Sequence, residues 1–382
     1  MVHTGGNVAP GYEGVRDAFV DNFLVSHDVG ASVAAWAHGR PVVSLWGGTA
    51  DQLDARPWTA DTIVTVFSMT KALTTTALLH LSERGGIELD APVARWWPEF
   101  EANGKGAITV RMLLSHRAGL PAVEGTFTLD EALSWDPIVT ALAAQAPRWK
   151  PDTSFGYHLR TFGWLVGEVF RRAAGCTVGQ YARAHIAGPL GLDWHLPLPE
   201  EHEPRVARLV MPPAAYFDFM ASLPADLLLV EAGGTPSGLF RYDDMWNTRA
   251  LRAVELPSSN SVTNAAAVAK FYAALLQPID GVRLLQDETV ADATIVRSSG
   301  ADQVLMSEMV YGTGYTLAPS LPAAVGAEAF GHGGAGGSIG FADPSAGLAF
   351  AYTQNKLVFA LTADQRRERL VDALYESHRA AG

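Results

Sequence analysis

The sequence contains little cysteine and no long apolar run, and each shortage excludes a class of protein. Its single thiol, Cys176, has no partner for an internal disulfide, and the flanking Gly175 and Thr177 predict a turn between helices. No uninterrupted apolar stretch reaches the roughly 18 residues that a membrane-spanning helix needs. The first residues have neither the basic segment nor the apolar core of a signal peptide, which predicts a cytoplasmic protein.

Positive charge is also scarce, because 28 lysines and arginines face 40 acidic residues and leave a formal net charge of -12. A surface of that sign cannot release counterions from nucleic acid or hold an anionic membrane, so we expect neither as a partner. The 11 histidines show no H-E-x-x-H or comparable ligand spacing, and we expect no metal and no cofactor. The sequence carries no signal for an oligomeric state.

What is present is typical of a globular protein: 382 residues, 48% of them hydrophobic, are enough for one elaborate domain or two modest ones. Strand patterns lie near both ends of the chain and helical patterns lie between them. We expect strands in residues 30–50 (a hairpin), 62–67, 311–317, 338–342 and 347–352, a glycine-rich turn at 331–337, and helices at 15–25, 68–84, 130–145, 162–174 and 362–378.

This order predicts an α/β (α+β) protein whose sheet is assembled from both ends of the chain. Residues 1–85 and 264–382 would form a discontinuous α/β domain, and residues 86–263 a mainly helical domain inserted into it. We expect the functional site in the cleft between the two domains.

Ser68 and Lys71 form the first candidate catalytic pair, because the helix predicted to begin at Ser68 places Lys71 one turn later on the same face. A serine hydroxyl needs a neighbouring base to act as a nucleophile, and a lysine amine can be that base if desolvation or nearby positive charge keeps it neutral. The helix N-terminus adds backbone N–H groups that can stabilise an oxyanion.

The simpler interpretation makes Ser68 a helix cap and Lys71 a solvated surface residue. Two observations weigh against it. With five lysines and 20 serines, chance gives only about a quarter of one S-x-x-K match in a chain of this length. Lys71 also lies in an apolar segment with little charge before Glu83, where burying an amine is costly.

These residues resemble a known family. Ser68-Met-Thr-Lys71 after a short strand, followed by Leu113-Leu-Ser-His-Arg-Ala-Gly-Leu120, is similar to the serine β-lactamase and penicillin-binding-protein superfamily, and within it to class C β-lactamases and family VIII carboxylesterases. The resemblance runs from about residue 30 to residue 352. It implies the β-lactamase-like fold, an antiparallel sheet flanked by helices with an inserted helical domain.

The second motif of that superfamily, Tyr-x-Asn, has its counterpart in Tyr157-His-Leu159. The resemblance implies that the Tyr157 phenol lies near Ser68 and Lys71, is held partly deprotonated by the lysine, and serves as a general base. Leu159 departs from the family's asparagine, which removes an amide that class C enzymes use around the β-lactam side chain. This departure predicts weak activity on β-lactams.

The third motif, Lys-Thr-Gly in β-lactamases, is matched by His332-Gly333-Gly334. The small residues would let a substrate lie along the strand, and the backbone N–H of Ala335 would form the oxyanion hole with that of Ser68. A histidine in place of the lysine exchanges a fixed charge for a titratable ring, which favours neutral esters. The alternative is that His332 is only a loop residue.

Two further motifs in this stretch are not expected to function. Gly336-Gly-Ser338-Ile-Gly340 matches the G-x-S-x-G nucleophile elbow, but a turn at Asp343-Pro344 follows where that motif needs a helix. Gly331 to Gly336 matches G-x-G-x-x-G without the helix and the later acidic residue of a dinucleotide site.

We therefore expect a serine esterase for short-chain carboxylic esters, with a small-molecule ester as its partner. Ser68 would form the acyl-enzyme while Lys71 and Tyr157 share the proton transfers. The alternatives are a promiscuous β-lactamase, a D-amino-acid amidase or peptidase, an acyltransferase that uses an alcohol instead of water, and a catalytically silent binding protein.

Overall fold

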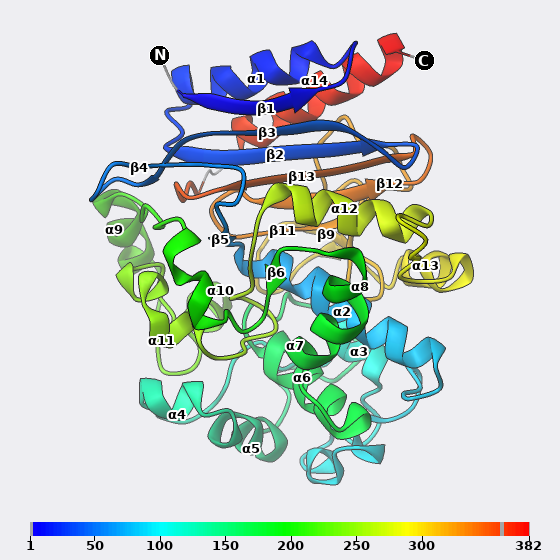
Figure 1. Ribbon diagram of the computed structural model, residues 1–382. Coiled ribbons are helices and arrows are strands. Elements are labelled where there is room, and N and C mark those ends of the chain that lie inside the picture. Colours follow the sequence, from blue (N-terminus) through cyan, green and yellow to red (C-terminus); the bar gives the residue numbers. More distant parts are fainter. Residues whose placement is uncertain (1–2, 360–362, 382) are drawn as a thin grey trace.

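A large antiparallel sheet forms the centre of the structure (Figure 1), a computed structural model that describes residues 3–359 and 363–381. Strands from the two ends of the chain meet in it, because β2 from the N-terminal part pairs with β13 from the C-terminal part. This confirms the predicted fold class. The strand order is β1 (Thr4–Val8), β3 (Arg40–Asp51), β2 (Gly30–Ala37), β13 (Leu348–Gln354), β12 (Ile339–Asp343), β11 (Phe330–Gly333), β10 (Thr316–Leu317), β9 (Glu308–Tyr311) and β8 (Ser298–Ala301), with β4 (Arg56–Pro57) paired to β3.

Two terminal helices, α1 (Glu13–Leu24) and α14 (Gln365–Ala381), pack against each other and cover one face of the sheet (Figure 1). Their apolar residues share a core with inward-facing strand residues; Phe19, Phe341, Phe350 and Leu374 are all fully buried there. The alternation of strand side chains makes this possible, since every second residue faces the helices.

The opposite face is covered by α12 (Ala265–Leu276), which packs on β2, β12 and β13. The other helices that follow β5 (Val64–Thr65) in the chain lie on this same side of the sheet (Figure 1). They are α2 (Thr70–Glu83), α3 (Val110–Leu114), α4 (Leu129–Leu133), α5 (Asp136–Ala144), α6 (Thr161–Ala174), α7 (Val178–Ala182), α8 (Gly188–Leu190), α9 (Ala214–Ser222), α10 (Leu228–Gly234), α11 (Arg249–Arg252) and α13 (Asp287–Ala293). The division into residues 1–85 with 264–382 and residues 86–263 stays a prediction.

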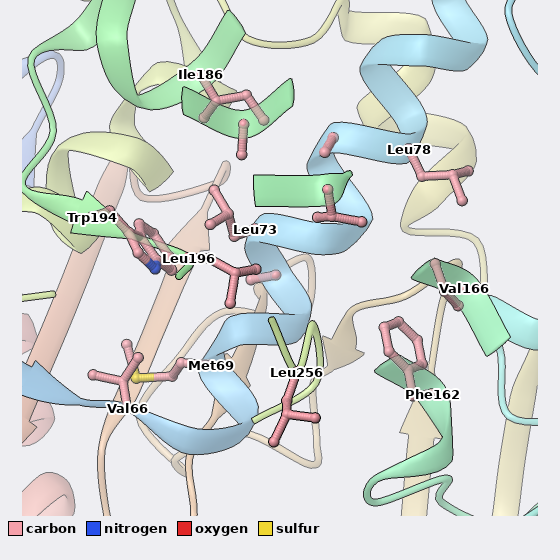
Figure 2. Close-up of a cluster of buried hydrophobic side chains, with 14 of the residues drawn as sticks. Val66, Met69, Leu73, Leu78, Phe162, Val166, Ile186, Trp194, Leu196 and Leu256 are labelled. Atoms are coloured by element: carbon pink, nitrogen blue, oxygen red, sulfur yellow. The ribbon is translucent and has the colours of Figure 1, made fainter. Parts of the chain in front are cut away.

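Helix α2 runs through the middle of this region and is buried from Thr70 to Leu81. Figure 2 shows its Leu73 and Leu78 among side chains from elements far away in the sequence, including Phe162 and Val166 of α6 and Trp194 of β6 (Trp194–His195). A helix that is buried all round needs no polar face, which explains the low charge of this segment.

A second sheet of three short strands fixes the chain just before α2. Its strand order is β5 (Val64–Thr65), β7 (Val262–Thr263) and β6, and all pairs are antiparallel. The backbone N–H of Val66 also donates to the Ser261 carbonyl, at 3.1 Å. The segment that leads into α2 is therefore fixed by consecutive backbone hydrogen bonds to residues 261–263.

Several predicted boundaries are wrong for identifiable reasons. The strand expected at 62–67 is shorter, because Phe67 has a positive φ of 47° and begins a 3-10 turn, Phe67–Met69, before α2. The helix expected at 130–145 divides into α4 and α5 at Trp135, whose φ is 75°. The strand expected at 311–317 divides into β9 and β10 around Gly314, whose φ is 84°.

The glycine-rich turn expected at 331–337 is partly wrong, because Phe330–Gly333 forms β11 and pairs with β12. Glycine here allows close approach within the sheet, since a Cβ on Gly331 would lie 2.3 Å from the Gly340 carbonyl oxygen. The final helix begins at Gln365, and the expected start at Thr362 lies outside the described residues.

Across residues 3–359 and 363–381, no helix combines the length and the apolar character that crossing a membrane requires.

Candidate active site

The chain presents Ser68 at a strained corner between β5 and α2. Phe67 holds a left-handed backbone conformation that is costly for a bulky residue. Its ring packs edge-on against Tyr242 and Trp246, at centroid distances of 5.4 and 4.9 Å. This packing stabilises the corner and leaves Ser68 half-buried, between two fully buried neighbours.

Lys71 has no exposed surface, and its amine contacts three oxygen atoms. The Nζ atom lies 3.2 Å from Ser68 Oγ, and it donates to the carbonyl oxygens of Leu159 at 2.8 Å and Ser258 at 3.2 Å. Among the described residues, no carboxylate forms an ion pair with it. Burial therefore lowers the pKa of Lys71 well below its ordinary range, and the Arg160 guanidinium lowers it further.

Tyr157 is held by its backbone as well as by its ring. Its backbone N–H donates to both carboxylate oxygens of buried Asp302, at 3.0 and 2.9 Å. The ring stacks on Tyr311 at a centroid distance of 5.9 Å and meets the edge of His116 at 4.7 Å. Aromatic packing on two sides fixes the direction of the phenol.

The phenol of Tyr157 lies beside Lys71 and His332. Lys71 Nζ sits 4.7 Å from the ring centroid, and the hydroxyl lies 3.4 Å from His332 Nε2. Burial raises the pKa of Tyr157 above its ordinary value, and a hydrogen bond with Ser68 lowers it only in part. The raised pKa favours a protonated phenol, and the expectation that the lysine holds the phenol partly deprotonated stays a prediction.

His332 lies on strand β11, so the alternative that it is only a loop residue is also wrong. Its Nδ1–H donates to the Gly333 carbonyl at 2.7 Å, which leaves Nε2 as the acceptor for the Tyr157 hydroxyl. Burial, followed by the charge of Lys71, lowers the pKa of His332 to about 3. The ring is therefore neutral at neutral pH.

The turn between β11 and β12 closes against the segment that carries Ser68. A Cβ on Gly334 would lie 2.2 Å from the Val66 carbonyl oxygen, so only glycine fits this approach. In the described part of the chain, the backbone N–H groups of Ser68 and Ala335 have no hydrogen-bond partner. Two unpaired donors near a nucleophile are the components of an oxyanion hole.

Leu159 contacts Lys71 through its backbone. Its carbonyl accepts from Lys71, while the half-buried side chain packs against a cluster that contains Phe155, Tyr157 and Tyr311. The structure thus brings together Ser68, Lys71, Tyr157, Leu159, His332, Gly333, Gly334 and Ala335 from three separate parts of the chain.

Several residues near this cluster were not identified from the sequence. The backbone carbonyl of Ser258 accepts from Lys71, and the carboxylate of Asp302 accepts from the Tyr157 backbone N–H. Contacts that involve the backbone leave no recognisable pattern in the sequence. His158 accepts from the Leu120 N–H at 3.0 Å, and burial lowers its pKa to about 4. His116 lies in the 113–120 motif, which was the one available signal for it.

The two motifs that we expected not to function lack the necessary geometry. Ser338 is buried, and it is followed by strand β12 rather than by a helix. The same strand follows Gly331 to Gly336, so no helix N-terminus is available for a dinucleotide. Cys176 lies between α6 and α7 as predicted, and burial raises the pKa of its thiol, the opposite of activation.

Within the described ranges, no group of three or more histidine, cysteine, aspartate or glutamate side chains is placed to hold a metal ion.

Comparison with known proteins identifies the family of this chain. A family model described as beta-lactamase matches residues 17–375. The esterase/beta-lactamase LipL of Mycobacterium tuberculosis is 35% identical over 93% of this chain and 84% of its own length. A crystal structure of a family VIII carboxylesterase covers 98% of this chain and 100% of its own, with 35% identity and a TM-score of 0.89.

A penicillin-binding-protein homologue from Caulobacter crescentus is equally similar in structure, with 36% identity, a TM-score of 0.89, and coverage of 98% of this chain and 100% of its own. Both the family model and these relatives extend over nearly the whole chain, including the segments that carry Ser68, Tyr157 and His332. The chain therefore belongs to the beta-lactamase family of hydrolases and has esterases among its relatives.

Proposed function

We propose that this protein is a serine carboxylesterase that hydrolyses short-chain carboxylic esters through an acyl-enzyme on Ser68. The environment of Lys71 is the observation that carries the proposal. A neutral amine has two N–H groups and one lone pair, and Lys71 faces two carbonyl oxygens and one hydroxyl. The two carbonyls take the N–H groups, so the lone pair is left for the proton of Ser68.

In the first half of the reaction, the Ser68 oxygen attacks the ester carbonyl while its proton passes to Lys71. The negative charge that develops on the carbonyl oxygen is stabilised by the backbone N–H groups of Ser68 and Ala335. Collapse of the intermediate breaks the bond to the alcohol oxygen, and Tyr157 gives that oxygen a proton. The raised pKa of Tyr157 suits this role of proton donor.

In the second half, the Tyr157 phenolate takes a proton from water, and the resulting hydroxide attacks the acyl group on Ser68. When the acyl bond breaks, protonated Lys71 returns its proton to the Ser68 oxygen. Each group ends in its starting state. The acid product and the alcohol together account for the ester and one water molecule.

The features of the site favour a neutral ester over a β-lactam. Leu159 has no amide to offer a β-lactam side chain, and a neutral His332 offers no fixed charge to a substrate carboxylate. A mostly apolar cavity of about 450 Å³ lies near the site, because its lining residue Tyr242 packs against Phe67, the neighbour of Ser68. Its other lining residues include Tyr216, Phe217, Met220 and Phe240, and such a lining suits an apolar acyl group. The name of the LipL relative pairs the two activities, and this keeps β-lactam hydrolysis as a second candidate.

The proposal is tested with p-nitrophenyl butyrate and two serine variants. Ser68→Ala should reduce kcat by at least about 10³-fold because it removes the nucleophile, while Ser338→Ala, as the matched control, should keep most of the activity. The reverse result would exclude the proposed nucleophile.

Rates on nitrocefin and on D-amino-acid amides, measured on the same preparation, separate an esterase from a β-lactamase or an amidase. If a second alcohol is added and its butyrate ester is formed, the enzyme is an acyltransferase. If a fluorophosphonate probe does not label the wild-type protein, the protein is a binding protein.

A further inference from the structure

Arg160 is a buried cation beside the proposed catalytic lysine. It follows Leu159 in the chain, stands at the N-cap of helix α6, and is only 3% exposed. Its guanidinium carbon lies over three aromatic rings, 4.8 Å from the centroid of Trp246, 5.1 Å from that of Tyr242 and 6.0 Å from that of Phe240. Attraction to the ring faces partly offsets the loss of water.

The stability of the fold does not explain a cation at this position. In the part of the chain that the structure describes, Arg160 has no carboxylate partner, and its side chain makes only two long hydrogen bonds, to the carbonyls of Gly233 at 3.5 Å and Phe240 at 3.4 Å. A helix N-terminus also repels positive charge. Arg366, which is buried to the same degree, instead pairs with Asp28 and Asp364.

The backbone of Arg160 belongs to the shell that holds Lys71. The preceding carbonyl, that of Leu159, accepts from the Lys71 amine, and so does the Ser258 carbonyl. Ser258 in turn donates its hydroxyl hydrogen to the Arg160 carbonyl, at 2.9 Å. The same α6 N-terminus places the Phe162 ring 5.6 Å from Lys71 Nζ. The guanidinium is thus fixed relative to the amine by a continuous set of contacts.

Among residues 3–359 and 363–381, the side chains around Lys71 carry positive charge or none. The titratable side chains that face or act on it are Tyr157, His116, His158, His332 and Arg160. Burial keeps the histidines neutral, because it lowers the pKa of each of them. Arg160 is therefore the permanent charge in this shell, and its repulsion adds to the effect of burial on the pKa of Lys71.

We propose that Arg160 is an electrostatic positioning residue whose fixed charge, held by the rings of Phe240, Tyr242 and Trp246, keeps the Lys71 amine uncharged so that it can accept the Ser68 proton. This inference rests on the proposed role of Lys71 as the base. Arg160 acts through Lys71 in this proposal, since its guanidinium neither donates nor accepts a proton in the reaction.

The test compares Arg160→Met, which has similar length and no charge, with Arg160→Lys, which keeps the charge. Two rates are measured against pH: kcat/KM on p-nitrophenyl butyrate and labelling of Ser68 by a fluorophosphonate. Without the cation, the pKa of Lys71 rises and less of the amine is neutral at a given pH. We expect the acidic limb of both profiles to move to higher pH by at least about 0.5 unit in the methionine variant, and by less in the lysine variant.

Arg183→Met serves as the control, because it removes an arginine from an exposed position, and its profiles should match the wild type. An acidic limb that stays at the wild-type pH in Arg160→Met, with an intact Tm, overturns the inference. Arg160→Gln is the second uncharged variant, and failure of both uncharged variants to fold assigns Arg160 a structural role and also overturns it. If wild-type protein neither hydrolyses esters nor reacts with the probe, it is the proposed function that fails.

Discussion

At the scale of single residues, Lys71 shows how a site of this kind opposes stability. An amine that is protonated in the unfolded chain must give up its proton, or remain charged without water, when the chain folds. Three oxygen contacts compensate for part of that cost, and none of them comes from a carboxylate. The same desolvation that weakens the fold favours the neutral amine that the proposed role of base requires.

This conflict predicts a specific pH dependence of stability for Lys71→Met. The native pKa of Lys71 lies below its ordinary value of 10.5, so between these values the unfolded state binds one more proton than the native state. The unfolding free energy of the wild type should therefore rise relative to the variant by about 1.4 kcal/mol per pH unit within that range. Urea titrations between pH 7 and pH 10.5 measure this difference. Lys150→Met, at an exposed position, should show no such trend, and a flat difference for Lys71→Met would mean that its amine is not perturbed.

At the scale of elements, the turn between β11 and β12 depends on a helix from the far end of the chain. The Gly336 carbonyl, next to Ala335, accepts from Gln354 Nε2 and Arg366 Nη2, both at 2.7 Å, and from the Val358 N–H at 3.1 Å. Arg366 lies at the start of α14, on the other side of the sheet from α12. The helix thus fixes the turn that carries the Ala335 N–H group.

Arg366→Ala should destabilise the protein by about 3–5 kcal/mol, because it leaves the buried carboxylates of Asp28 and Asp364 without their cation. It also removes one of the three donors to Gly336. Thermal and chemical unfolding measure the loss. The control is Arg379→Ala, an exposed arginine of the same helix, which should change stability by no more than about 0.5 kcal/mol. Equal effects for the two variants would contradict the buried network.

At the scale of the whole molecule, the two ends of the chain complete one sheet and one core. Strand β2 pairs with β13 over seven residues, from Ala31 opposite Gln354 to Ala37 opposite Leu348. Helix α14 adds Leu370, Val371 and Leu374 to the core that it shares with α1, and all three are fully buried. Neither end can complete its core without the other.

Removal of residues 360–382 should therefore abolish cooperative unfolding and leave the protein insoluble. Each of the three buried side chains contributes about 1.5–3 kcal/mol, and Arg366 adds to this, while the whole fold has only about 5–15 kcal/mol to lose. Near-UV circular dichroism and a thermal melt test the truncated chain. Removal of residues 380–382 alone, as the control, should keep the wild-type transition. A truncated protein that melts cooperatively would show that the sheet is complete without α14.

The sequence by itself determined what is local or carried by residue type. The alternating strands near both ends were sufficient to predict the fold class, and the Ser68 and Lys71 spacing with the apolar length of α2 indicated a candidate nucleophile segment. The resemblance to known motifs added Tyr157, His332 and the glycines. Boundaries failed where single residues adopt a positive φ, as at Phe67 and Trp135, because such conformations are imposed by packing that lies elsewhere in the chain.

Only the tertiary structure decided the chemistry of these residues. The contacts of Lys71 with Leu159 and Ser258, the neutral state of His332 and the place of Arg160 depend on segments more than 80 residues from Lys71. The pKa of a side chain is set by its burial and by charges nearby in space, and neither can be inferred from the neighbouring residues in the sequence. The physical reason is that the desolvation of a group depends on how the whole folded molecule surrounds it, whereas helix and strand propensity depends on the residue type.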